Sequence, residues 1–94
     1  MSEQIIESSG NVFADLGFSP EESTLLGLRS GLMNELRQIL QEKNWTQQQA
    51  ATALGVSQAR ISDLMRGKWE KFSLDMLVTL ASRAGRKISL VTHA

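Results

Sequence analysis

The spacing of apolar residues predicts one long helix in the first half of the chain. In residues 19–44, leucine and isoleucine recur every three or four positions, which places them on one face of a helix. Ser19 can cap this helix, Pro20 suits its first position, and Glu22 can complete a capping box with Ser19. The expected inward stripe consists of Leu25, Leu28, Leu32, Leu36 and Ile39, with Leu26, Met33 and Leu40 widening it.

Two shorter helices are expected in the segment WTQQQAATALGVSQARISDLMRGK, residues 45–68. Thr46, with a glutamine three positions later, predicts a second capping box, and Gly55 suits a left-handed stop after the first short helix. Ser57 is the expected cap of the second short helix, and Gly67 its expected end. A turn of about three residues that contains glycine predicts that the two helices cross steeply instead of lying antiparallel.

A fourth helix and a short strand follow. In residues 68–85, Ser73 is the expected cap of the helix and Gly85 its expected stop. Residues 86–94 change to an alternating pattern, which predicts one strand. Because no other strand is expected in the chain, we expect this one to pair with its copy in a two-fold dimer. The candidate dimerisation residues are Lys87, Ile88, Ser89, Leu90 and Val91.

Composition suits a single soluble domain. The chain has 94 residues, of which 41% are hydrophobic and 21% are charged. No apolar run approaches the length that crosses a membrane, and no secretory signal is recognisable at the N-terminus. The chain also lacks cysteine, which excludes disulfides and fits a reducing compartment. We therefore expect a cytoplasmic protein with no membrane partner.

The net charge of zero conceals a polarised distribution. Through Glu42, two bases against seven acids give −5, and from Lys43 onward, eight bases against three acids give +5. Such a distribution suggests two surfaces with different partners, and the basic half is a candidate for binding a polyanion.

The second short helix offers a face suited to DNA. Outside its apolar positions, residues 57–66 are short or able to hydrogen-bond, and such side chains fit the major groove of double-stranded DNA. Gln47 starts the preceding helix and can hold a phosphate there, with Lys43, Lys68 and Lys71 as flanking counter-charges. The candidate DNA-binding residues are Thr46, Gln47, Ser57, Gln58, Ala59, Arg60, Ser62, Asp63, Arg66 and Lys68.

The segments TQQQAA, LGVSQARIS and LMRGK give residues 32–84 a resemblance to the Xre/Cro/cI-like helix-turn-helix family. The resemblance implies an all-α, lambda-repressor-like bundle of about five helices, with the short C-terminal strand pairing across a dimer. Asp63 departs from the family pattern, where an uncharged polar or basic residue is common. We expect its carboxylate to accept from a cytosine amine or to pair with Arg60 or Arg66. The resemblance assigns DNA-facing roles to Gln47, Ser57, Gln58, Ala59, Ser62 and Asp63.

The whole chain resembles, more narrowly, the HigA-type antitoxins of bacterial toxin–antitoxin operons, through NVFADLGFSPEES, GKWEKFSLDML and KISLV. This resemblance implies a homodimer that represses its own operon and neutralises an mRNA-cleaving toxin. The acidic N-terminal half would complement a basic toxin. The expected organisation is an arm over residues 1–18, partly disordered or partner-binding, a helix-turn-helix DNA-binding domain over 19–85, and a dimerisation strand over 86–94. The candidate toxin-binding residues are Val12, Phe13, Leu16 and Phe18.

Other readings of the sequence stay open. The chain could be a stand-alone phage or plasmid-type repressor, or an interaction module whose helix-turn-helix no longer binds DNA. No paired carboxylates or glycine-rich phosphate loop indicate an enzyme, and His93 stands alone, so we expect no metal and no cofactor. Trp45 is expected at the edge of the core. Trp69 is expected in a loop near the DNA backbone.

Overall fold

The long helix forms as α2, Pro20–Lys43, in the computed structural model, which describes residues 4–5 and 15–93. The Ser19 hydroxyl accepts from the Glu22 amide at 3.2 Å, and the Glu22 carboxylate accepts from the Ser19 amide at 3.1 Å. The predicted capping box is therefore confirmed. The bond from the Ser19 backbone amide, and then the one with the Ser19 hydroxyl, hold the pKa of Glu22 below its ordinary value.

The two shorter helices form as α3, Gln47–Leu54, and α4, Gln58–Met65. Thr46 and Gln49 make the second capping box, and Ser57 caps α4 by accepting from the Arg60 amide. Gly55 ends α3 with a φ of 70°, in the left-handed region that favours glycine. The caps and the stop expected here are all confirmed.

The rest of the helical part consists of a 3-10 helix, η1, Trp69–Lys71, and of α5, Leu74–Arg83. Ser73 caps α5, and Gly85 follows it with a φ of 87°. With α2, α3 and α4, the described residues thus contain four α-helices and one 3-10 helix. The expectation of an all-α helix-turn-helix bundle is confirmed.

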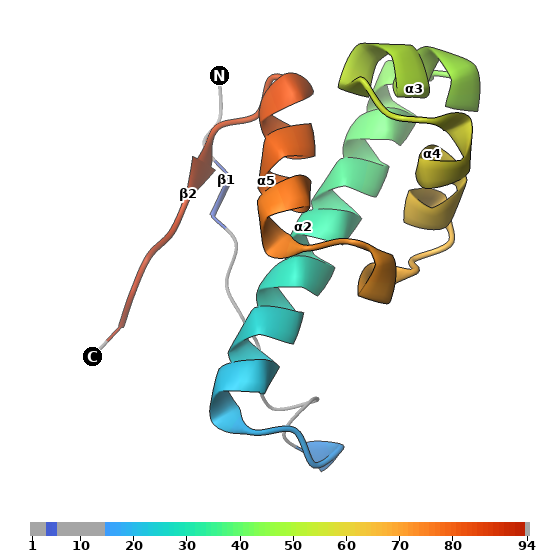
Figure 1. The fold of residues 1–94 in the computed structure, drawn as a ribbon. Coiled ribbons are helices and arrows are strands. Elements are labelled where there is room, and N and C mark those ends of the chain that lie inside the picture. The colour runs from blue at the N-terminus through green and yellow to red at the C-terminus, as the bar shows by residue number, and fades with distance from the viewer. Residues whose placement is uncertain (1–3, 6–14, 94) are drawn as a thin grey trace.

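The helices enclose one core (Figure 1). In the figure, α5 packs along α2, while α3 and α4 pack together near the C-terminal end of α2. One expected member of the stripe on α2 is wrong, because Leu25 is 49% exposed. The α2 helix begins beyond the end of α5, where no described helix covers this face. The largest fully buried side chains are Phe72, Leu36, Ile39, Leu54, Ile61, Leu64, Leu77 and Leu80.

The C-terminal strand has a partner in its own chain, contrary to expectation. It forms as β2, Ile88–Ser89, and pairs in parallel with β1, Gln4–Ile5. The two strands lie beyond α5, on the side away from α4 (Figure 1). The pairing involves two residues in each strand, too few for a pattern of alternating residues to reveal it. One edge of β2 is thus covered by β1, and the described residues leave the other edge without a strand.

None of the described helices combines the length and apolar character needed to span a membrane.

Candidate nucleic-acid interface

One face of α4 is held in the core and the opposite face lies at the surface. Ile61 and Leu64 are almost completely buried, with exposed fractions of 1% and 0%. On the outer side, the first residues of the helix are the most exposed, and Ser62 and Asp63 are half-buried. The outward face of α4 is therefore mostly polar, and it is most accessible at its two ends. The exposed positions of this segment are Ser57, Gln58, Ala59 and Arg66.

The start of α3 offers backbone amides beside this face. The capping box uses the amides of Thr46 and Gln49, so the amides of Gln47 and Gln48 are the first-turn donors without a partner inside the helix. Gln47 is itself exposed. First-turn amides at the positive end of a helix suit an anion such as a phosphate.

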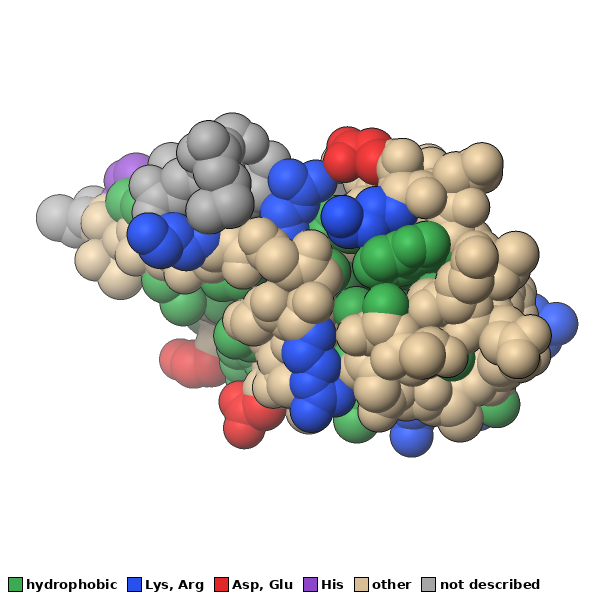
Figure 2. All heavy atoms as spheres, turned by 90° about the horizontal axis from the view of Figure 1, so that it is seen from above, with side chains coloured by type: hydrophobic (Ala, Val, Ile, Leu, Met, Phe, Trp, Pro, Cys, Tyr) green, Lys and Arg blue, Asp and Glu red, His purple; other side chains and the backbone are tan. Residues whose placement is uncertain are grey.

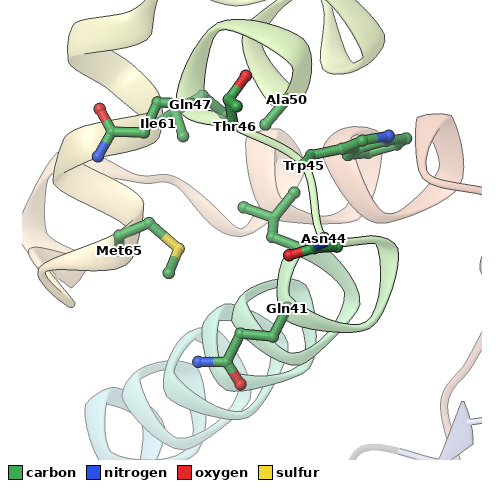
Figure 3. A pocket seen from close by; sticks show the side chains of 9 residues that line it. Gln41, Asn44, Trp45, Thr46, Gln47, Ala50, Ile61 and Met65 are labelled. Atoms are coloured by element: carbon green, nitrogen blue, oxygen red, sulfur yellow. The ribbon is translucent and has the colours of Figure 1, made fainter.

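A hollow of about 350 Å³ separates the start of α3 from α4. Figure 3 shows Thr46 and Ala50 on its α3 side, with Met65 of α4 at one end and Trp45 at the other. Trp45 packs against the core, as expected for a residue at its edge. The hollow therefore adds a concave surface next to the exposed face of α4.

The turn between α3 and α4 is fixed from α5. The Arg83 guanidinium donates from Nη1 to the Leu54 carbonyl at 2.8 Å, at the last residue of α3. A Cβ added to Gly55 would lie 3.1 Å from the same nitrogen. Val56 is partly buried against the core and donates to the Ala51 carbonyl at 3.0 Å. These contacts set the direction in which α4 leaves the turn.

Two further arginines fix the segment after α4. Arg29 of α2 donates from Nε to the Phe72 carbonyl at 2.9 Å and from Nη2 to the Trp69 carbonyl at 3.1 Å. Arg60 donates to the Lys71 carbonyl at 3.0 Å and lies over the Phe72 ring. Sequence reasoning missed the roles of Arg29 and Arg83. Arg29 did give a signal, because it interrupts the inward stripe of α2.

The Asp63 carboxylate pairs with two lysines that follow α4. Its Oδ1 lies 3.9 Å from Lys68 Nζ, and its Oδ2 lies 3.7 Å from Lys71 Nζ. The expected pairing with Arg60 or Arg66 is wrong. The chain turns back at Gly67, which has a φ of 70°, and so brings the two lysines alongside the helix.

Residues 12–93 match a family described as a helix-turn-helix domain. The chain belongs to this family. No curated protein sequence and no solved structure gives a match. Membership indicates a DNA-binding regulator, and helix-turn-helix domains are typically not enzymes. In such a domain, two helices joined by a short turn and the exposed face of the second helix are the parts that meet DNA.

Several cations of the helix-turn-helix domain are engaged within the protein. Figure 2 looks down on the end formed by α3 and the C-terminal ends of α2 and α5, where Lys and Arg side chains lie in several separate places among apolar and other side chains. Lys43 lies over the Trp45 ring at 5.4 Å, and Arg86 donates to the Glu42 carboxylate at 2.9 Å. In the described part of the chain, Arg66 makes no ion pair and is exposed directly after α4. The charge of +5 in the basic half therefore overstates what is available to DNA.

The predicted dimerisation and toxin-binding positions lie in two other places. Leu90 and Val91 are 67% and 46% exposed after β2, and Leu16 and Phe18 are 70% and 36% exposed before α2. Val12 and Phe13 lie outside the described residues. Trp69, expected near the DNA backbone, is half-buried against the core with the Arg29 guanidinium 5.4 Å from its ring centre.

Proposed function

We propose that this protein is a sequence-specific transcriptional repressor that binds operator DNA with α4 in the major groove. The observation that carries the proposal is the exposed polar face of α4, backed by the buried Ile61 and Leu64. An α-helix with short polar side chains at its outer face fits the width of that groove. The arginine contacts at both ends of α4 support the same proposal, because a reading helix must be held in one orientation.

The residues of α4 divide by the chemistry of their side chains. Gln58 can pair with an adenine through one donor and one acceptor, Ala59 can touch a thymine methyl, and Arg66 can bind guanine or phosphate. Gln47 and the first-turn amides of α3 would hold a backbone phosphate and so fix the position of α4 along the duplex. Ser57 and Ser62 can donate hydrogen bonds from their hydroxyl groups to bases or phosphates of the DNA.

Selection from a pool of randomised 30-base-pair duplexes tests this proposal. The wild-type protein should enrich a defined sequence, and Gln58→Ala should weaken binding to it by about 1–3 kcal/mol while relaxing one base preference. Gln38→Ala, which removes an exposed glutamine from α2, is the matched control and should bind as the wild type does. An equal loss on random and selected duplexes would assign Gln58 to the DNA backbone. Absence of any DNA binding would favour an interaction module.

We also propose that the repressor is a homodimer assembled through β2. The edge of β2 that β1 leaves open, together with the exposed Leu90 and Val91, would pair with the same segment of a second copy. A two-fold axis would then relate the two α4 helices, which should lie about 34 Å apart to enter successive major grooves.

A second proposed function is that of an antitoxin. It is supported by the apolar residues exposed at the start of α2, where a hollow of about 250 Å³ is lined by Phe18, Leu25 and Trp69. Asp15, Glu21 and Glu22 are exposed in the same part of the sequence. An apolar surface with acidic neighbours suits a basic partner, as an mRNA-cleaving toxin would be. The resemblance to HigA-type antitoxins points in the same direction.

Co-expression with the product of a neighbouring toxin-sized reading frame tests the second function. The two proteins should co-purify, and Leu25→Lys should weaken the complex while DNA binding is retained. Asn34→Lys adds the same charge at an exposed position farther along α2 and should leave the complex intact. If no such reading frame adjoins the gene, a stand-alone repressor is the better assignment.

A further inference from the structure

Asp63 lies at the edge of the exposed face of α4, where its charge opposes DNA binding. It is the only acid in residues 57–66, and it sits in the last turn of α4. Ser62 and Arg66 are four positions apart and share one face, and Asp63 lies beside that face, on the side of Lys71 in η1. Its carboxylate lies within 4 Å of two ammonium groups, those of Lys68 and Lys71.

Stability of the fold does not account for an acid at this position. The side chains of the three groups have exposed fractions of 20%, 38% and 49%, and exposed ion pairs of this kind contribute only about 0–1 kcal/mol. A negative charge near the C-terminal end of a helix is also disfavoured by the helix dipole.

We propose that Asp63 is a specificity-determining residue that lowers binding to DNA of the wrong sequence. This inference rests on the proposed function of α4 in the major groove. Beside the carboxylate, Lys68 and Lys71 offer the phosphates a combined charge of +1 instead of +2, which weakens the part of binding that ignores sequence.

The same carboxylate discriminates between bases. It can only accept hydrogen bonds, and in the major groove only cytosine and adenine present an amine that donates one. Opposite guanine or thymine, Asp63 would face acceptor oxygens and lose its hydration without compensation. A hydrogen bond from the amine of cytosine or adenine offsets the repulsion between the Asp63 carboxylate and the DNA phosphates. With guanine or thymine at that position, the repulsion is not offset. Asp63 therefore widens the gap in affinity between the operator and other DNA.

The test compares the wild type with Asp63→Asn, which keeps the shape of the side chain and removes its charge. Fluorescence anisotropy would measure binding to a random 30-base-pair duplex and to the duplex selected by the wild type. On the random duplex, affinity should rise about three- to tenfold, and the slope of log affinity against log salt should steepen by roughly 0.9. On the selected duplex the gain should be smaller or reversed. Selection by Asp63→Asn should lose the requirement for cytosine or adenine at one position of one strand in each half-site.

Glu70→Gln is the matched control, since Glu70 is exposed on η1 and its substitution changes the net charge by the same amount. It should leave the ratio of selected to random affinity unchanged. An equal effect of Glu70→Gln and Asp63→Asn, or an unaltered base preference in Asp63→Asn, would overturn the inference. The proposed function would survive that result if Gln58→Ala still relaxed its own base preference. A wild type that enriches no sequence would overturn both.

Discussion

At the scale of single residues, three arginines show that the number of charges in a sequence does not predict which of them bind groups within the protein. Arg29, Arg60 and Arg83 each donate to a backbone carbonyl next to α4. An arginine can satisfy carbonyls from several directions because its planar guanidinium carries five donors. These three side chains therefore help to fix the orientation of α4.

Arg83 offers the clearest test of such a role. Arg83→Gln should lower the free energy of unfolding by about 1–3 kcal/mol, because the Leu54 carbonyl loses a charged donor. Binding to the selected duplex should weaken more than binding to random DNA, since the helix that reads bases is held less firmly. Urea denaturation and fluorescence anisotropy would measure the two effects.

The salt dependence separates this role from a phosphate contact. Arg83→Gln should leave the slope of log affinity against log salt unchanged, whereas Arg66→Gln should reduce it by about one unit if Arg66 binds phosphate. A reduced slope in Arg83→Gln would mean that Arg83 meets the DNA backbone, and the positioning role would be wrong.

At the scale of helices and strands, local patterns predicted most of the structure. The capping boxes at Ser19 and Thr46 and the stop at Gly55 depend on residues three or four positions apart, so the sequence alone indicates them. The pairing of β1 with β2 joins the two ends of the chain over two residues each, and no local pattern reveals it. Asp63 pairs with Lys68 and Lys71 because the chain turns back at Gly67. The periodicity of α4 does not predict the direction of the chain after the helix.

The candidate site divides in the same way. The sequence placed Gln47, Gln58 and Arg66 on exposed positions, because the spacing of buried residues defines the opposite face of a short helix. It did not distinguish Arg60 or Arg83 from cations free to meet DNA. Their partners are backbone carbonyls on segments that only the tertiary structure brings near.

Gly55 allows a prediction about the α3–α4 turn. Gly55→Ala should destabilise the protein through two effects, the left-handed φ of 70° and the approach of the new Cβ to within 3.1 Å of Arg83 Nη1. The first effect alone costs about 1–2 kcal/mol. Gly85→Ala is the matched control, since Gly85 has a φ of 87° and no neighbour within 4 Å of an added Cβ.

Thermal or urea unfolding of the two variants would separate the effects. The loss in Gly55→Ala should exceed that in Gly85→Ala, and its DNA binding should weaken because Arg83 must move. Equal decreases in the free energy of unfolding would show that the Arg83 side chain moves aside without a measurable energetic penalty. The left-handed backbone conformation alone would then make glycine necessary at position 55.

At the scale of the whole molecule, the proposed homodimer depends on the open edge of β2. Deletion of residues 87–94 removes β2 with Leu90 and Val91, and should give monomers with much weaker operator affinity. A monomer loses the gain from binding two half-sites at once. Light scattering would measure the mass, and gel shift the affinity. A dimer that survives the deletion would place the interface elsewhere, on the face of α2 that carries Gly27 and Gly31.

The parallel pairing of β1 with β2 has a practical consequence for work on this protein. Both strands lie beyond α5, far from the outward face of α4 (Figure 1). Because the two strands run in the same direction, a label attached just before β1 and one attached just after β2 would leave the strand pair at opposite ends, both on the side of α5 away from α4. Attachment to a surface through either label should leave the outward face of α4 accessible to DNA duplexes in solution.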